Sequence, residues 1–285
     1  MYIYHQAAGR LGNSIIRYLI STIFAIEYGD YILCETDFSE YKKYTNYYIY
    51  KEPEFVKWKN YRIKNNHTLE MNDFLQTDMV VFEGCFQYFD ILKIYKQRIF
   101  DYLREHTEYI LTMPDNFKDK YYIRDILFTP ANFHKYYDIV VHVRLEDFIN
   151  IDKIHHPYCL ENVINNIIVY EEDIDKNNVC FVCNKTTSEL ERTYLNFFAN
   201  KYNVVFESND IITDFHIMKN AKILLCSLST FSWCSAYFSD SIKRIYFPAY
   251  DIDKVYREPP IDNVIFYEPK IITKKELESL FIEIL

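Results

Sequence analysis

Two polar side chains emerge together at the end of an apolar segment, and their types suit the binding of an anion. The segment 139–141 is typical of a buried strand, and His142, Arg144 and Asp147 follow at its carboxyl end. Because side chains alternate along a strand, His142 and Arg144 face the same side, where burial is costly without a ligand or partners. The forked guanidinium of Arg144 matches phosphate oxygens. A buried ion pair between Arg144 and Asp147 that only closes the strand end is the alternative, and the residues alone leave both open.

A run of hydroxyl groups is the second candidate site. Ser229, Thr230 and Phe231 follow the apolar segment 223–226 and open a predicted helix. Hydroxyls and free backbone N–H groups at a helix N-terminus can bind phosphate. An ordinary helix cap uses the same residue types. Asp214, on the preceding predicted helix, could accept hydrogen bonds from a nucleobase edge or lie on a solvated turn.

The loop 9–13, between the first predicted strand and the first predicted helix, is the third candidate. Gly12 lets the backbone approach a ligand, Arg10 supplies positive charge, and Asn13 could cap the helix or present its amide to a hydroxyl. A capped turn with a surface arginine is the simpler interpretation. The third glycine of the dinucleotide-binding fingerprint is missing, which argues against an oxidoreductase.

An alternation of apolar strands and helices must position these segments. The second half of the chain predicts strands over 138–143, 179–183, 203–207, 222–226 and 244–247, with helices over 157–170, 187–201, 212–220 and 231–239. The first half predicts strands over 2–5, 31–34 and 79–83, with helices over 14–28 and 88–105. This order is typical of α/β proteins with parallel sheets covered on both faces, in which ligands bind at the carboxyl ends of strands.

The length of 285 residues suits two small α/β domains. Weak patterning over 108–136 marks the boundary between them. We predict an N-terminal domain over 1–130 with a loop-rich insertion at 36–78, a second domain over 131–270, and a C-terminal helix over 271–285.

Charge and cysteine content exclude some classes of protein. A net charge of −9 argues against a nucleic-acid binder, because such binding requires the neutralisation of many phosphates. The seven cysteines lie mostly in apolar runs, which favours reduced thiols and a cytoplasmic protein. Cys180 and Cys183 have metal-ligand spacing but lack a second pair, so we interpret them as core.

No segment predicts a membrane anchor. The chain opens at Met1 on an apparent strand without a basic leader, which indicates no signal peptide. The longest apolar run, 15–26, contains Arg17 and is too short for a bilayer of about 30 Å. Transient membrane contact, to reach lipid-linked glycans, stays open.

Taken in order, the three candidate segments resemble the α-1,2-fucosyltransferases, and more broadly the inverting fucosyltransferases that share an H-x-R-x-x-D motif. His142, Arg144 and Asp147 supply that motif here. The segment 82–87 is similar to the family's E-G-Y-F-Q sequence, and 214–218 leads into 229–233 as in the family. The resemblance covers most of the chain outside 36–78.

The resemblance implies a GT-B-like pair of Rossmann-type domains whose parallel sheets face a cleft. The implied reaction transfers fucose from GDP-fucose to a hydroxyl of a glycan acceptor, with inversion and an α-1,2 linkage, and without a metal or other cofactor. The second domain would bind the donor.

Roles for single residues are implied by the same resemblance. Arg144 would bind the diphosphate, His142 and Asp214 the guanine, and Ser229, Thr230 and Phe231 the phosphates. Arg10, Gly12 and Asn13 would face the reacting centre, with Glu83 and Gln87 on the acceptor side. Arg144, Asp147 and Asn13 are the implied catalytic residues. Asp147 is the nearest candidate for a general base, although an adjacent arginine lowers a carboxyl pKa and favours a role in orienting Arg144.

The sequence departs from the family pattern in several places. Ala8 replaces a glycine, Ser14 a glutamine, Leu145-Glu146 an Arg-Gly pair and Cys234 a tryptophan. Glu146 adds negative charge near the implied diphosphate site, which leaves open another nucleotide sugar, such as a rhamnose, xylose or mannose donor. A catalytically inactive sugar- or nucleotide-binding module is a further alternative. The D-x-D pairs Asp173/Asp175 and Asp251/Asp253 are interpreted as solvated surface.

Overall fold

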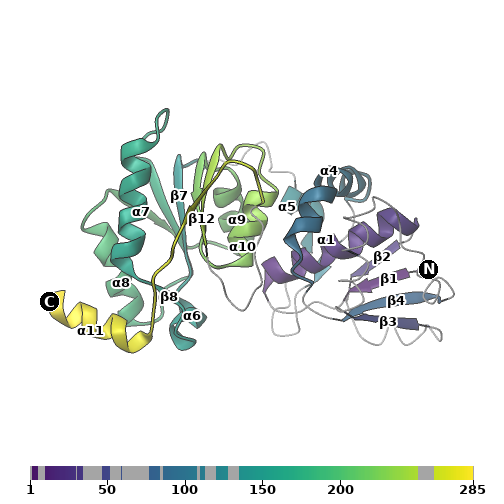
Figure 1. Cartoon of the computed structure of the whole chain (residues 1–285), viewed down its shortest axis with the longest axis horizontal. Coiled ribbons are helices and arrows are strands. Elements are labelled where there is room, and N and C mark those ends of the chain that lie inside the picture. The colour runs from purple at the N-terminus through teal and green to yellow at the C-terminus, as the bar shows by residue number, and fades with distance from the viewer. Residues whose placement is uncertain are drawn as a thin grey trace. The chain divides into compact units, whose positions relative to one another are not determined.

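Two parallel sheets organise the chain, one in each of the units Met1–Pro130 and Ala131–Leu285 (Figure 1). The computed structural model describes residues 2–5, 10–29, 31–34, 47–51, 59, 77–83, 86–107, 110–112, 120–127, 135–249 and 260–284. The parallel strands in both sheets confirm the predicted α/β class.

The first unit contains a four-stranded sheet in the order β2-β1-β4-β3. Its strands are β1 (Tyr2–His5), β2 (Tyr31–Cys34), β3 (Tyr47–Lys51) and β4 (Met79–Glu83). Helix α1 (Leu11–Tyr28) packs on β1 and β2 and against α4 (Phe89–Glu105). The antiparallel pair β5 (Ile110–Thr112) and β6 (Lys120–Tyr122) precedes α5 (Ile123–Leu127).

The segment 36–78, predicted as a loop-rich insertion, contains the strand β3, which pairs in parallel with β4, and most of its other residues lie outside the described ranges. A Tyr-rich run has strong strand propensity, but its pairing partner lies far along the chain. One expectation for this unit is corrected. Helix α1 begins at Leu11 rather than Ser14, with Arg10 as its N-cap, so Gly12 lies inside the first turn.

The second unit contains a six-stranded sheet in the order β10-β9-β7-β11-β12-β13. Its strands are β7 (Ile139–Val143), β9 (Val179–Cys183), β10 (Val204–Glu207), β11 (Ile223–Leu225), β12 (Arg244–Pro248) and β13 (Val264–Tyr267). The helices are α6 (Glu146–Asn150), α7 (Pro157–Tyr170), α8 (Glu189–Ala199), α9 (Ile211–Lys219), α10 (Thr230–Tyr237) and α11 (Lys274–Ile284). A short antiparallel pair joins β8 (Ile154–His155) to β14 (Ile271–Ile272). Helices α7 and α8 lie on one side of this sheet, and α9 and α10 on the other (Figure 1).

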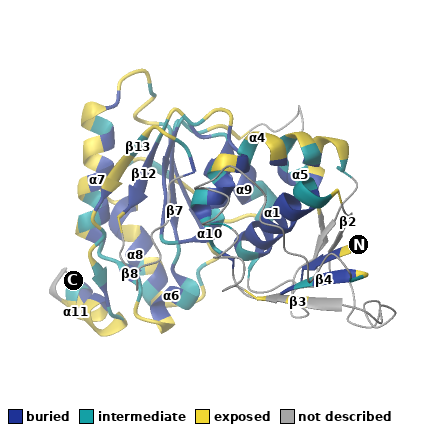
Figure 2. Cartoon of the chain, turned by 45° about the vertical axis from the view of Figure 1, so that its right-hand side comes forward, coloured by how far each residue is buried: buried dark blue, intermediate teal, exposed yellow. Residues whose placement is uncertain are grey.

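Burial is complete along the central strand β7 and incomplete at the sheet edges (Figure 2). Residues of β7, α7, α8 and α11 form one hydrophobic cluster. The edge strands expose Val205 and Phe206 on β10 and Ile265 and Phe266 on β13. The expectation of a sheet covered on both faces therefore holds for the central strands and fails at the edges.

The cysteines of β9 lie in the core. Cys180 and Cys183 are free thiols and both are buried. Burial raises the pKa of the Cys183 thiol to about 12.

None of the helices in the described part of the chain has both the length and the apolar character that a bilayer span requires.

Replacing a core residue of α11 should destabilise the protein. Leu277 is fully buried in the hydrophobic cluster, so Leu277→Ala should lower the free energy of unfolding by about 2–5 kcal/mol in urea denaturation. Ile282 on the same helix is 76% exposed, and Ile282→Ala should change it by less than about 0.5 kcal/mol. Equal losses for the two variants would show that α11 does not dock through Leu277.

Candidate functional site

The guanidinium of Arg144 is fixed at the carboxyl end of β7 by three contacts. Its Nε and Nη2 atoms donate to the two carboxylate oxygens of Asp147 at 3.1 and 2.8 Å. Nη1 donates to Oγ of Ser229 at 2.9 Å, and the group stacks 4.7 Å from the ring centroid of Phe148. Three of the five guanidinium N–H groups have these partners, and within the described part of the chain the other two have none and can bind a ligand.

The side chain of Arg144 is 15% exposed and lines a small pocket. The ion pair with Asp147 that the sequence left open is present, but it does not close the strand end. The Arg144–Asp147 pair holds the arginine in place while part of its guanidinium stays accessible.

Ser229 presents a hydroxyl donor beside Arg144. As the N-cap of α10, its Oγ accepts from the backbone N–H of Phe231 at 3.2 Å as well as from Nη1 of Arg144. A serine hydroxyl also has one hydrogen to donate, and none of the residues described accepts it. Thr230 opens the helix and is buried. Hydrogen-bond donors from two segments of the chain, the one that follows β7 and the N-terminus of α10, therefore lie side by side.

His142 lies next to this point and is buried. Its Nδ1 is 2.8 Å from Oγ of Ser227, and its ring is 5.9 Å from that of Phe231. Burial, with additional repulsion from Arg144 and from His155, lowers the pKa of His142 to about 3. The imidazole is therefore neutral at physiological pH and can exchange hydrogen bonds without adding charge.

The pocket at the end of β7 is small, with a cavity volume of about 10 Å³, and part of it opens to solvent. Its lining includes His142, Arg144, Phe148 and Ser227, together with His155 of β8. Sequence reasoning missed His155, since β8 has only two residues and no periodicity marks it.

Asp214 is buried on α9 and does not lie on a solvated turn. Its Oδ1 accepts from the backbone N and from Nδ2 of Asn209, at 3.1 and 3.0 Å. No residue in the described ranges donates to Oδ2. Burial raises the pKa of this carboxyl despite the two bonds from Asn209.

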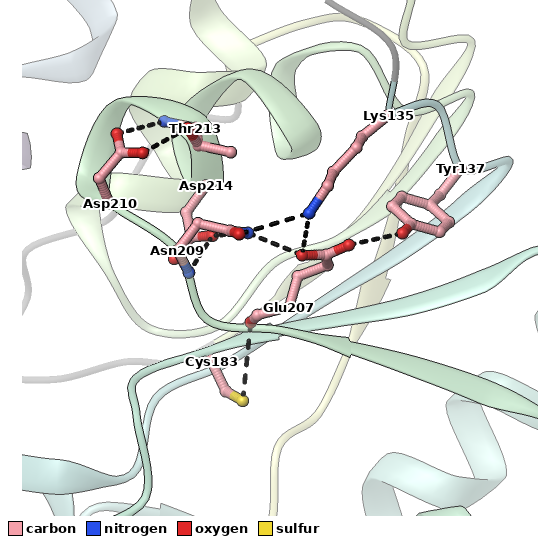
Figure 3. A network of polar contacts seen from close by, with 8 residues as sticks. All are labelled: Lys135, Tyr137, Cys183, Glu207, Asn209, Asp210, Thr213 and Asp214. Carbon is pink, nitrogen blue, oxygen red and sulfur yellow. Dashed lines mark hydrogen bonds and ion pairs between the residues drawn. The ribbon is translucent and has the colours of Figure 1, made fainter.

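A polar network holds Asn209 in place (Figure 3). Glu207, at the end of β10, accepts from Tyr137, Lys135 and Asn209 at 2.6, 2.7 and 2.7 Å. Burial favours the neutral acid, but the hydrogen bonds from these three residues bring the pKa of Glu207 below its usual value. The same Asn209 amide group bonds to both Glu207 and Asp214, so the network fixes the position of Asp214.

In the first unit, Asn13 lies in the first turn of α1 and does not cap it. Its Oδ1 accepts from Nε2 of Gln87 at 3.1 Å. The two residues were predicted separately, and the fold brings them together. Glu83 ends β4, and its side chain lies outside the described residues.

Two further expectations concern acidic residues. Asp173 and Asp175 are exposed, whereas Asp251 and Asp253 lie outside the described residues. In the ranges that the structure covers, no group of three or more His, Cys, Asp or Glu side chains could hold a metal ion.

Glu146 stands where the fucosyltransferases that the sequence resembles commonly have a glycine. Its backbone has a positive φ of 22°, a conformation that favours glycine. Its carboxylate accepts from Nδ2 of Asn184 at 2.8 Å. The carboxylate of Glu146 is therefore hydrogen-bonded to Asn184, the residue that follows β9.

Glu207→Gln should destabilise the protein in a pH-dependent manner. A glutamine presents an NH₂ group to the donors of Lys135 and Asn209, so the free energy of unfolding at pH 7 should fall by about 1–3 kcal/mol. Because the folded-state pKa of Glu207 lies below its ordinary 4.5, the contribution is present above that pH and is lost as the pH falls through the folded pKa. In urea denaturation, the difference in the free energy of unfolding between the native protein and Glu207→Gln should be smaller at pH 4 than at pH 7.

The exposed Glu172 gives a matched control, and Glu172→Gln should change the free energy of unfolding by less than about 0.5 kcal/mol. A deficit for Glu207→Gln of the same size at both pH values would contradict the ionic role of Glu207.

Comparisons with known proteins give structural likeness only. No family model and no curated protein matches the chain. Fucosyltransferase NodZ from Bradyrhizobium is 9% identical, with a TM-score of 0.47, over 84% of this chain and 92% of that one. E. coli heptosyltransferase WaaC with ADP-2-deoxy-2-fluoro heptose is 10% identical, with a TM-score of 0.44, over the whole of both chains. A mutant of Arabidopsis thaliana FUT1 in complex with GDP is 8% identical, with a TM-score of 0.43, over 88% of this chain and 71% of that one. These identities and TM-scores do not place the chain in a family.

Proposed function

We propose that this protein is an inverting glycosyltransferase that transfers fucose from GDP-fucose to a hydroxyl of a glycan acceptor, in an α-1,2 linkage. The observation that carries the proposal is the guanidinium of Arg144, oriented by Asp147 and Ser229 and open to a pocket at the carboxyl end of a parallel sheet. The ordered motifs that resemble the inverting fucosyltransferases support GDP-fucose as the donor.

The diphosphate of the donor would bind where hydrogen-bond donors gather. The two remaining N–H groups of Arg144, the hydroxyl of Ser229 and the N-terminus of α10 with Thr230 all present positive or donor character. Such an arrangement stabilises the negative charge that develops on a departing diphosphate. The proposal therefore needs no metal ion and no other cofactor.

The guanine would bind near Asp214. A carboxylate whose Oδ1 is already bonded to Asn209 can accept on Oδ2 from the N1 and N2 groups of the base. His142 is assigned to the guanine as well, and its ring contacts that of Phe231, which is assigned to the phosphates.

The reaction is a direct displacement at the anomeric carbon. The acceptor oxygen forms the new bond, the bond from the anomeric carbon to the phosphate oxygen breaks, GDP leaves, and the proton of the acceptor hydroxyl passes to solvent water. Both oxygens of Asp147 are bonded to Arg144, which supports an orienting role for Asp147 rather than that of the base. Arg10, Gly12 and Asn13 of the first unit are assigned to the reacting centre, and Glu83 and Gln87 to the acceptor side.

GDP should stabilise the protein against heat, and UDP and NAD should not. At about 100 times its dissociation constant, GDP should add about 2.7 kcal/mol to the free energy of unfolding. Arg144→Ala should remove most of this gain, since it deletes the phosphate-binding group, and Asp147→Ala should reduce it, since Arg144 loses its orienting partner. Thermal melts with each nucleotide make the measurement, and GDP release from GDP-fucose in the presence of glycan acceptors tests turnover.

Arg192 is the matched control, because like Arg144 it has an acidic partner three residues away, but its side chain is exposed and does not line the pocket. Arg192→Ala should retain the full GDP effect. Equal stabilisation of the Arg144→Ala and native proteins by GDP would overturn the proposal.

Asp214→Asn should weaken GDP binding and spare phosphate binding. The amide replaces an acceptor with a donor at the base edge, so GDP affinity should fall about tenfold or more, while the affinity for inorganic pyrophosphate stays unchanged. Isothermal titration calorimetry with both ligands separates the two effects. A parallel loss for pyrophosphate would assign Asp214 to the phosphates instead of the base.

A further inference from the structure

One residue that lines the pocket has a buried ring nitrogen without a partner among the described residues. Nε2 of His155 is inaccessible to solvent and makes no hydrogen bond within the described ranges, and the residue lines the pocket together with Arg144 and His142. Buried polar atoms are almost always paired, so an orphan in a native structure calls for an explanation, such as a ligand that is absent. His155 is outside the motifs that carry the family resemblance.

The backbone around His155 is held firmly. His155 pairs with Ile271 in the two-stranded sheet β8-β14, and its carbonyl oxygen accepts from the hydroxyl of Tyr194 at 2.9 Å. The ring of Tyr267 approaches that of His155 edge-on, with centroids 6.3 Å apart. The imidazole is thus fixed by packing, as a ligand-binding group must be, rather than by a hydrogen bond at Nε2.

The charges around His155 favour an anionic partner. Among the described residues, none that lines the pocket is acidic, and two N–H groups of the Arg144 guanidinium have no partner. Asp147 bonds to Arg144 but does not line the pocket. Burial lowers the pKa of His155 to about 4, so at physiological pH its ring is neutral and carries one N–H.

We propose that Nε2 of His155 donates a hydrogen bond to a phosphate oxygen of the nucleoside diphosphate that Arg144 binds. This inference rests on the proposed function, because it takes the donor's diphosphate as the ligand. His155 becomes a second phosphate-binding residue, from a different segment of the chain than Arg144 and Ser229.

The test is calorimetric titration of the full chain with GDP and with guanosine. His155→Ala should weaken GDP binding about three- to tenfold, the contribution of one hydrogen bond, and should leave guanosine binding unchanged. In His155→Gln the side-chain amide keeps an N–H donor near the position of Nε2, so this variant should recover part of the GDP affinity. It also keeps the proposal testable if the alanine variant does not fold. The neighbouring His156 does not line the pocket, and His156→Ala should bind GDP as the native protein does.

The outcomes separate the two proposals. If the native protein binds no GDP, the proposed function fails. If Arg144→Ala loses GDP affinity while His155→Ala keeps it, the proposed function stands and the role of His155 is wrong. A His155→Ala loss of equal size for guanosine and GDP also overturns that role, because it would indicate a general disturbance of the pocket.

Discussion

The charge-assisted contact of Arg144 with Asp147 and Ser229 is the constraint on which the site depends. A long, flexible arginine side chain loses much rotamer freedom when it is fixed, and an oriented guanidinium binds a ligand at a lower entropic cost. Here the bidentate bond to Asp147 sets the plane of the group, Ser229 sets its rotation, and Phe148 supports one face. The remaining N–H groups are thereby presented in a defined direction.

The parallel sheet makes this arrangement available. Strands β7 and β11 are neighbours, so the segments that follow them meet at one edge of the sheet although 85 residues separate Arg144 from Ser229. The helix α10 begins at Thr230, after the short segment that follows β11, and its N-terminal dipole adds to the positive character of Arg144. The site is built mostly from backbone placement, with few side chains.

Polar networks behind the site maintain its geometry. The bonds from Glu207 through Asn209 to Asp214 restrain a carboxylate that burial would otherwise protonate or displace. Histidines serve differently, since burial keeps His142 and His155 neutral and able to donate without repelling Arg144. Such rigidity is what the recognition of a defined ligand requires.

By itself, the sequence determined the α/β class, most strands and helices of the second unit, and the common face of His142 and Arg144, because these follow from local periodicity and alternation. Tertiary structure decided the rest. Strand order brings Ser229 to Arg144, and short elements such as β8, which carries His155, have no period to detect. The strand β3 and the exposed sheet edges likewise depend on which distant segment pairs with which, a choice made by packing rather than by any local pattern.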